Sequence, residues 1–226
     1  MDLDTKDGSA VVEDAPIIPF VDIEALDSEA REVLDHTINV MGGRIANSMR
    51  VYLHRGDIGR LISDMNDTIN ASPRSTLDPS LKPKLGVICS STNGCAYCTS
   101  HQCGLAQSPA AQAGRWSPQA GEVTTGLSDE QILALISGED KGADEIERIC
   151  FEYARVASEN PGGVSDDLLR RMTAVLTPAQ IVEVACVVGF WKFVNTVHDS
   201  LHIPKEAHLS KYWGVIEAGR ARASGG

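Results

Sequence analysis

One segment of the chain, residues 181–201, is apolar on nearly every side when it is drawn as a helix. It reads IVEVACVVGFWKFVNTVHDSL and follows Thr177-Pro-Ala-Gln180, a capping box with proline at the favoured first helical position. Pro204 then ends the helix. Because a helix that is apolar all round belongs in a protein core, we expect this one to be buried.

Helical spacing of apolar residues recurs along the rest of the chain, and no alternating βαβ pattern is present. Residues 84–92 are compatible with a strand by propensity, but their small side chains favour a helix that packs closely against its neighbours. The sequence therefore predicts an all-α fold, a helical bundle. Its further helices are expected over 27–41, 47–70, 84–92, 95–107, 128–136, 143–159 and 165–172.

The length of 226 residues suits one large domain or two small lobes that share a core. No apolar run reaches the roughly 18–20 residues that cross a bilayer, and the first ten residues lack the apolar stretch of a signal peptide. We therefore expect a cytoplasmic protein. The predicted organisation is a mobile N-terminal tail (1–16), one all-α domain (17–219) and a flexible C-terminal tail (220–226). Within the domain we expect a first lobe over about 17–107, a loop over 108–126 and a second lobe over about 127–219.

The formal net charge of −11 bears on the choice of partners. An acidic surface without a basic cluster repels phosphate groups, so nucleic acid and anionic membranes are excluded as partners. A small molecule remains the expected substrate.

The sequence Asn93-Gly-Cys95-Ala-Tyr-Cys98-Thr-Ser-His101 is the candidate site. Two cysteines three residues apart lie on adjacent positions of one helical turn, so their sulfurs can meet. The start of a helix lowers the pKa of a nearby thiol, which would make Cys98 a thiolate. His101 lies three residues beyond Cys98 on the same face and can exchange a proton with its sulfur.

Three interpretations of this motif compete. A redox dithiol needs a second sulfur, an activated thiolate and a proton shuttle, and the motif contains all three. A metal site would use Cys95, Cys98 and His101 together with a distant histidine, either His198 or His202. In the third interpretation the cysteines are small core residues. We favour the redox dithiol and expect neither a metal nor a cofactor.

The segment LKPKLGVICSSTNGCAYCTSH (81–101) resembles the core of the carboxymuconolactone decarboxylase and alkylhydroperoxidase D superfamily. Segments 43–65, 127–138 and 176–206 resemble other helices of its peroxidase-related branch. The resemblance implies an all-α fold of the alkylhydroperoxidase D-like type, often with two related lobes. It also implies a homo-oligomer, which would be a trimer, a hexamer or a dimer.

By the same resemblance, Cys98 would attack a peroxide and Cys95 would resolve the product to a disulfide. A thiol or dithiol reductant, or a partner protein, would then restore both thiols. Family members commonly carry a glutamate twelve residues before the first cysteine, where this chain has Pro83. Glu183 and His198 are the candidates for replacing it in a proton relay. The simpler interpretations are a Glu183 salt bridge with Lys192 or a neighbouring subunit, and a hydrogen-bonded interface role for His198.

The leading functional hypothesis is a thiol-dependent peroxide reductase or related disulfide oxidoreductase, an antioxidant enzyme of the peroxiredoxin type. In it, Cys98 attacks, Cys95 resolves and His101 manages protons. The alternative is a non-redox decarboxylase or lyase on the same scaffold, acting on a small organic acid without need of the cysteines. A third possibility is a helical interaction protein whose dithiol is vestigial.

Overall fold

The computed structural model describes residues 16–40, 45–108 and 126–224, and over these ranges it contains helices and no strand. The all-α prediction is confirmed. Short 3-10 turns lie at Ile23–Ala25, Pro161–Gly163 and Ala207–Leu209. The α-helices are α1 (Ser28–Val40), α2 (Asn47–Tyr52), α3 (Gly56–Asn70), α4 (Leu81–Thr92), α5 (Ala96–Ala106), α7 (Asp129–Ser137), α8 (Glu145–Glu159), α9 (Asp166–Val175), α10 (Pro178–Ser200) and α11 (Lys211–Ser224).

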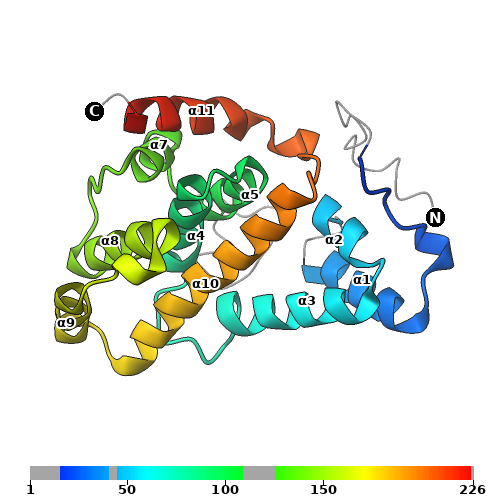
Figure 1. Cartoon of the computed structure of the whole chain (residues 1–226), viewed down its shortest axis with the longest axis horizontal. Helices are drawn as coiled ribbons and strands as arrows, with labels where there is room; N and C mark the ends of the chain where they lie inside the picture. The colour runs from blue at the N-terminus through cyan, green and yellow to red at the C-terminus, as the bar shows by residue number, and fades with distance from the viewer. Residues whose placement is uncertain (1–15, 41–44, 109–125, 225–226) are drawn as a thin grey trace.

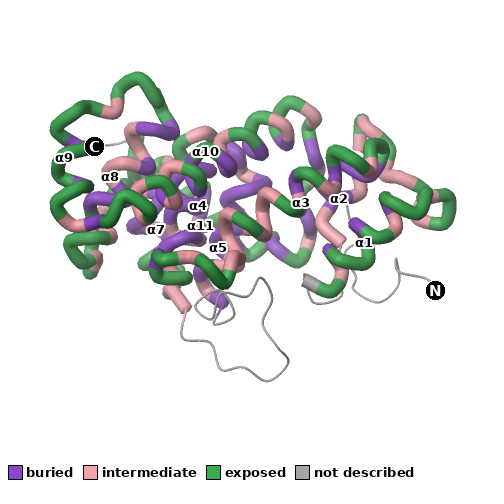
Figure 2. Tube along the Cα trace, turned by 90° about the horizontal axis from the view of Figure 1, so that it is seen from below, coloured by how far each residue is buried: buried purple, intermediate pink, exposed green. Residues whose placement is uncertain are grey.

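Helices α4 and α10 form the centre of the molecule. Figure 1 shows α10 crossing the middle, with α1, α2 and α3 to one side of it and α8 and α9 to the other. Helix α4 packs against α5, α7, α8 and α10, and α11 covers α5 and α7. Buried positions gather along these central helices, whereas α9 at one end is largely exposed (Figure 2).

The caps predicted from sequence are present. Thr177 and Gln180 form a capping box at α10, and Ser128 and Gln131 form one at α7. The structure adds a capping box at α8, between Asp144 and Glu147, that the sequence analysis missed. These caps satisfy N–H groups that a helix start leaves without a partner.

Helix α10 is buried on one side only. Val182, Cys186, Gly189 and Phe193 follow one another at helical spacing along its exposed side, and Val182 is 61% exposed. The predicted burial all round is therefore wrong for this stripe, because α3, α4 and α8 cover only the opposite side. By length and composition, α10 is the one helix in the described ranges that could cross a membrane, and such a helix is also common in the core of soluble proteins. The predicted homo-oligomer would cover the stripe and stays a prediction.

The segment 47–70 forms two helices rather than the one predicted. The chain turns after Tyr52, where Arg55 donates its backbone N–H to the Tyr52 carbonyl at 2.9 Å. Gly56 begins α3 so close to α1 that a Cβ atom there would lie 3.1 Å from the backbone nitrogen of Ala30. The turn brings the end of α2 and the middle of α3 to the same cavity.

The C-terminal end differs from the prediction too. Residues 220–226 were expected to be a flexible tail, but α11 continues to Ser224, and Arg222 pairs with Glu139 at 3.2 Å. Residues 1–15, most of the predicted loop 108–126, and residues 225–226 lie outside the described ranges. The division into two lobes stays a prediction, since the main core cluster contains residues from both, from Ala30 to Ile216.

We expect opposite effects of two glycine substitutions. A Cβ atom at Gly86 would lie 2.2 Å from Oε1 of the buried Gln102, so Gly86→Ala should lower the free energy of unfolding by about 1–3 kcal/mol. The matched control is Gly189→Ala on the exposed side of α10, where nothing lies within 4 Å of the added Cβ atom, and it should raise the free energy of unfolding by roughly 0.5–1 kcal/mol. Urea unfolding measures both, and equal effects would contradict the close α4–α5 packing.

Candidate active site

The two motif cysteines lie where α4 turns into α5. Asn93 and Gly94 make the turn, and Gly94 adopts a φ of 84°, a left-handed conformation that glycine accepts without strain. Cys95 is the N-cap of α5, and its sulfur accepts the backbone N–H of Cys98 at 3.3 Å. The direct contact with the helix start is therefore made by Cys95 rather than by Cys98.

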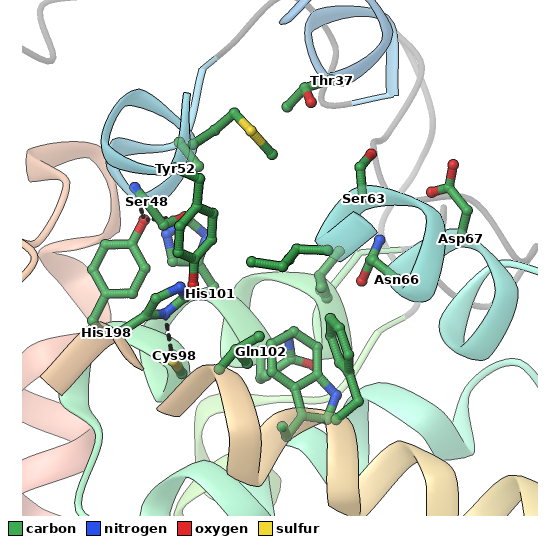
Figure 3. Close-up of a pocket in the computed structure, with 18 of the residues that line it drawn as sticks. Thr37, Ser48, Tyr52, Ser63, Asn66, Asp67, Cys98, His101, Gln102 and His198 are labelled. Atoms are coloured by element: carbon green, nitrogen blue, oxygen red, sulfur yellow. Dashed lines mark hydrogen bonds between the residues drawn. The ribbon is translucent and has the colours of Figure 1, made fainter. Parts of the chain in front are cut away.

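Cys98 contacts a histidine that lies 100 residues further along the chain. Its Sγ is 3.0 Å from Nδ1 of His198, which α10 contributes (Figure 3). Cys98 is 1% exposed, and the buried Cys95 side chain lies against it. Both thiols are free. The structure thus brings His198 to the dithiol, as one of the relay hypotheses required.

Burial determines the charge of this pair. It lowers the pKa of His198 to about 3, with a smaller contribution from the nearby His101. Burial, together with the adjacent Cys95 sulfur, raises the pKa of Cys98. We conclude that the resting pair is a neutral thiol in hydrogen-bond contact with a neutral imidazole. The predicted resting thiolate is wrong, because a sulfur enclosed in the protein loses more from desolvation than it gains from the helix start.

His101 has a different partner from the predicted one. Its Nε2 lies 2.8 Å from Oε2 of Glu206, while the Cys98 sulfur is bonded to His198. The ring of Tyr97 packs against both histidines, with its centroid 4.7 Å from that of His101 and 4.9 Å from that of His198. His101 is therefore a neighbour of the thiol–imidazole pair and not its proton partner in this structure.

Glu206 is a buried carboxylate that the sequence analysis did not single out. Burial by itself raises the pKa of Glu206, but attraction to His101 and hydrogen bonds outweigh it and lower the pKa to about 2. Glu206 Oε1 accepts the Asn47 N–H and the Tyr97 hydroxyl, each at 2.8 Å. These contacts join α2, α5 and the segment after α10 around the Glu206 carboxylate. No residue spacing in the sequence predicts them.

Glu183, the other relay candidate, lies elsewhere. Its carboxylate accepts hydrogen bonds from Ser75 and Thr76 and lies 3.4 Å from Nζ of the buried Lys82. His198 follows fifteen residues later on the same helix, about 22 Å along its axis. The structure therefore does not bring Glu183 to the dithiol, and Lys82 replaces the salt-bridge partner that was predicted, Lys192.

A cavity of about 150 Å³ opens beside Cys98. Figure 3 shows Tyr52, Cys98 and His198 on one side of it, with Ser63, Asn66 and Asp67 across from them. Apolar side chains form much of the lining, namely Met49, Ile62, Leu105, Phe190, Trp191 and Val194. Over the described ranges, no three His, Cys, Asp or Glu side chains gather in an arrangement that could hold a metal ion.

The Glu206 network should make stability depend on acid pH. The pKa of Glu206 is lower in the folded chain (about 2) than its ordinary value of 4.5, so its contribution of about 3 kcal/mol is complete above pH 4.5 and disappears as the pH falls toward 2. Glu206→Gln should remove it, so wild type and variant should differ at pH 7 and converge on acidification. Urea unfolding at several pH values measures this, with the exposed Glu217→Gln as a control that should change little. A difference that does not depend on pH would contradict the charge of Glu206.

No protein-family model matches the sequence, and no curated protein does. Solved structures do. A peroxidase-related protein from Ralstonia eutropha JMP134, described as an alkylhydroperoxidase AhpD core, superposes with a TM-score of 0.68 at 14% identity, over 84% of this chain and 92% of that one. An uncharacterized peroxidase-related protein from Silicibacter sp. TM1040 superposes with a TM-score of 0.64 at 17% identity, over 86% of this chain and 93% of that one.

A third similar structure is the debrominase Bmp8, with a TM-score of 0.66 at 16% identity, over 90% of this chain and 97% of that one. A variant of Bmp8 in which one cysteine is replaced by alanine has also been solved, in complex with 2,3,4-tribromopyrrole. At these identities the likeness concerns the fold. The protein therefore has the alkylhydroperoxidase D-like fold that the sequence resemblance predicted.

Proposed function

We propose that the protein is a thiol-dependent peroxide reductase in which Cys98 attacks the peroxide and Cys95 resolves the product. The observation that carries the proposal is the 3.0 Å contact between the Cys98 sulfur and His198 Nδ1 at the wall of a cavity. A thiol needs a proton acceptor in order to become a nucleophile, and a neutral imidazole in hydrogen-bond contact is such an acceptor. The similarity of fold to two uncharacterized peroxidase-related proteins is consistent with this proposal.

The proposed reaction balances without any further oxidant. The Cys98 thiol transfers its proton to His198, and the sulfur attacks the terminal oxygen of a peroxide ROOH. The S–O bond forms as the O–O bond breaks, which leaves a sulfenic acid and an alcohol. Cys95 then attacks the sulfenic sulfur, a disulfide forms, and water leaves. A thiol or dithiol reductant returns both cysteines to the reduced state by exchange.

His198 takes the role that the sequence analysis assigned to His101. In this proposal His101 and Glu206 act as positioning residues. Glu206 holds both His101 and the hydroxyl of Tyr97, and the Tyr97 ring packs edge-on against the ring of His198. These contacts restrain the orientation of the His198 imidazole next to the Cys98 sulfur.

The size and the apolar lining of the cavity favour an organic peroxide as substrate over hydrogen peroxide alone. Its volume of about 150 Å³ is close to that of a cavity which holds a benzene-sized molecule. Its lining is largely apolar, and Cys98 itself is 1% exposed, so a substrate has to enter the cavity to reach the sulfur.

A second candidate is reductive removal of a halogen from a small aromatic ring by the same dithiol. Phe190 and Trp191 line the cavity with Tyr52 and Tyr97, which suits an aromatic substrate. Bmp8, a debrominase of similar fold, supports this candidate. The aryl halide would become the arene and a hydrogen halide as Cys95 and Cys98 become a disulfide, so halide release separates the two activities.

The cysteine roles are tested by mass spectrometry after a pulse of cumene hydroperoxide. Wild type should lose two mass units as the Cys95–Cys98 disulfide forms. Cys95→Ser should instead accumulate a sulfenic acid at Cys98 that a dimedone probe traps, and Cys98→Ser should show neither product. The exposed Cys186→Ser is the matched control and should behave as wild type. Turnover of a substrate that survives the double Cys95→Ser, Cys98→Ser change would favour the decarboxylase or lyase alternative.

Proton transfer to His198 is tested by the rate of Cys98 oxidation. His198→Gln should slow this rate by about 100-fold, the lower end of what a positioned acid–base group contributes. The control is His54→Gln, because His54 is exposed and bonds the Pro19 carbonyl away from the cavity. If His101→Gln slowed Cys98 oxidation more than His198→Gln did, His101 would be the proton acceptor instead.

A further inference from the structure

Three residues that line the cavity each carry a buried polar atom that has no hydrogen-bond partner among the described residues. These atoms are the hydroxyl of Tyr52, Nε2 of His198 and the side-chain nitrogen of Gln102. Their residues are 7%, 7% and 1% exposed. Buried polar atoms in folded proteins nearly always have a partner. Three unpaired atoms around one cavity therefore indicate a ligand with polar atoms of its own.

Tyr52 is the one of the three whose hydroxyl is best placed to take part in chemistry. It is the last residue of α2, and its ring centroid is 5.6 Å from that of His198. Figure 3 shows Tyr52 extending into the cavity toward His198 and Cys98. Burial, with a further contribution from the two cysteine sulfurs, raises the pKa of Tyr52, so its hydroxyl keeps its proton.

The other tyrosine of the cavity is already engaged. The Tyr97 hydroxyl donates to Glu206 at 2.8 Å, so its proton is not available to a substrate. The Tyr52 proton has no such acceptor in the described part of the chain. The two hydroxyls therefore differ in function: that of Tyr97 is structural, and that of Tyr52 is free to donate.

We propose that Tyr52 is a catalytic residue that donates a proton to the oxygen leaving from the substrate. This inference rests on the proposed peroxide reduction. As the Cys98 sulfur bonds to the terminal peroxide oxygen, the second oxygen departs as an alkoxide, which is a strong base. Tyr52 gives it a proton and forms the alcohol, and the His198 imidazolium, which holds the former thiol proton, returns a proton to Tyr52.

The balance of this step needs no other reactant. The S–H and O–O bonds break, and the S–O bond and the O–H bond of the alcohol form. Sulfur is oxidised from thiol to sulfenic acid, and the peroxide is reduced. The side-chain nitrogen of Gln102 and Nε2 of His198 are two further unpaired nitrogens on residues that line the cavity.

The test compares Tyr52→Phe with wild type on two oxidants that differ in leaving group. Tert-butyl hydroperoxide expels a strongly basic alkoxide, whereas peracetic acid expels acetate, which needs no proton donor. In single-turnover oxidation of Cys98, the substitution should slow the hydroperoxide reaction by about 100-fold and the peracid reaction by less than about 3-fold. A merely structural role for Tyr52 would slow both reactions equally.

Two controls accompany this measurement. Tyr153→Phe, a half-buried tyrosine of α8 outside the cavity, should match wild type with both oxidants. The Tm of Tyr52→Phe should equal or exceed that of wild type, because the hydroxyl has no partner to lose in the described structure.

The outcomes separate the two proposals. If Tyr52→Phe slowed Cys98 oxidation equally with the two oxidants, or with neither, the role of Tyr52 would be overturned. The proposed peroxide reductase function would not be affected. A wild-type Cys98 that neither oxidant converts faster than the buried Cys89 would overturn the proposed function, and the role of Tyr52 would fall with it.

Discussion

The Cys98 thiol and the His198 imidazole meet 3.0 Å apart in an environment that disfavours charge on either group. The contact depends on α5 and α10 packing at a fixed separation, and both helices pack against α4. A neutral resting pair is less reactive than an exposed thiolate. In the proposed reaction, the pair would ionise when a substrate fills the cavity, and reactivity would then be limited to molecules that enter it.

A buried carboxylate beside this neutral pair organises the rest of the site. Glu206 is almost fully buried, yet it stays ionised because it accepts hydrogen bonds from Asn47 and Tyr97 and pairs with His101. Removing such a charge from water is costly unless its partners are held in place. The network therefore joins α2, α5 and the segment after α10, and it restrains the aromatic rings that flank His198.

Much of the fold could be read from local patterns. The capping boxes at Thr177 and Ser128 begin α10 and α7 where the sequence predicts helix starts. Apolar residues at helical spacing predicted most of the other helices. The errors arose where tertiary contacts override local preference. Segment 47–70 divides because Gly56 allows α3 to approach Ala30. The last turns of α11 stay helical because Arg222 reaches Glu139 in the loop after α7. Neither contact has a signature within a few residues of sequence.

The sequence by itself determined that the chain is helical and that two cysteines lie one helical turn apart, because both follow from spacings of a few residues along one helix. Only the tertiary structure decided which groups meet these sulfurs. The partner of Cys98 lies 100 residues away, and that of His101 lies 105 residues away. It also decided the charge of the site. Whether a thiol is ionised depends on how much water and which dipoles surround it, and packing between distant helices sets both.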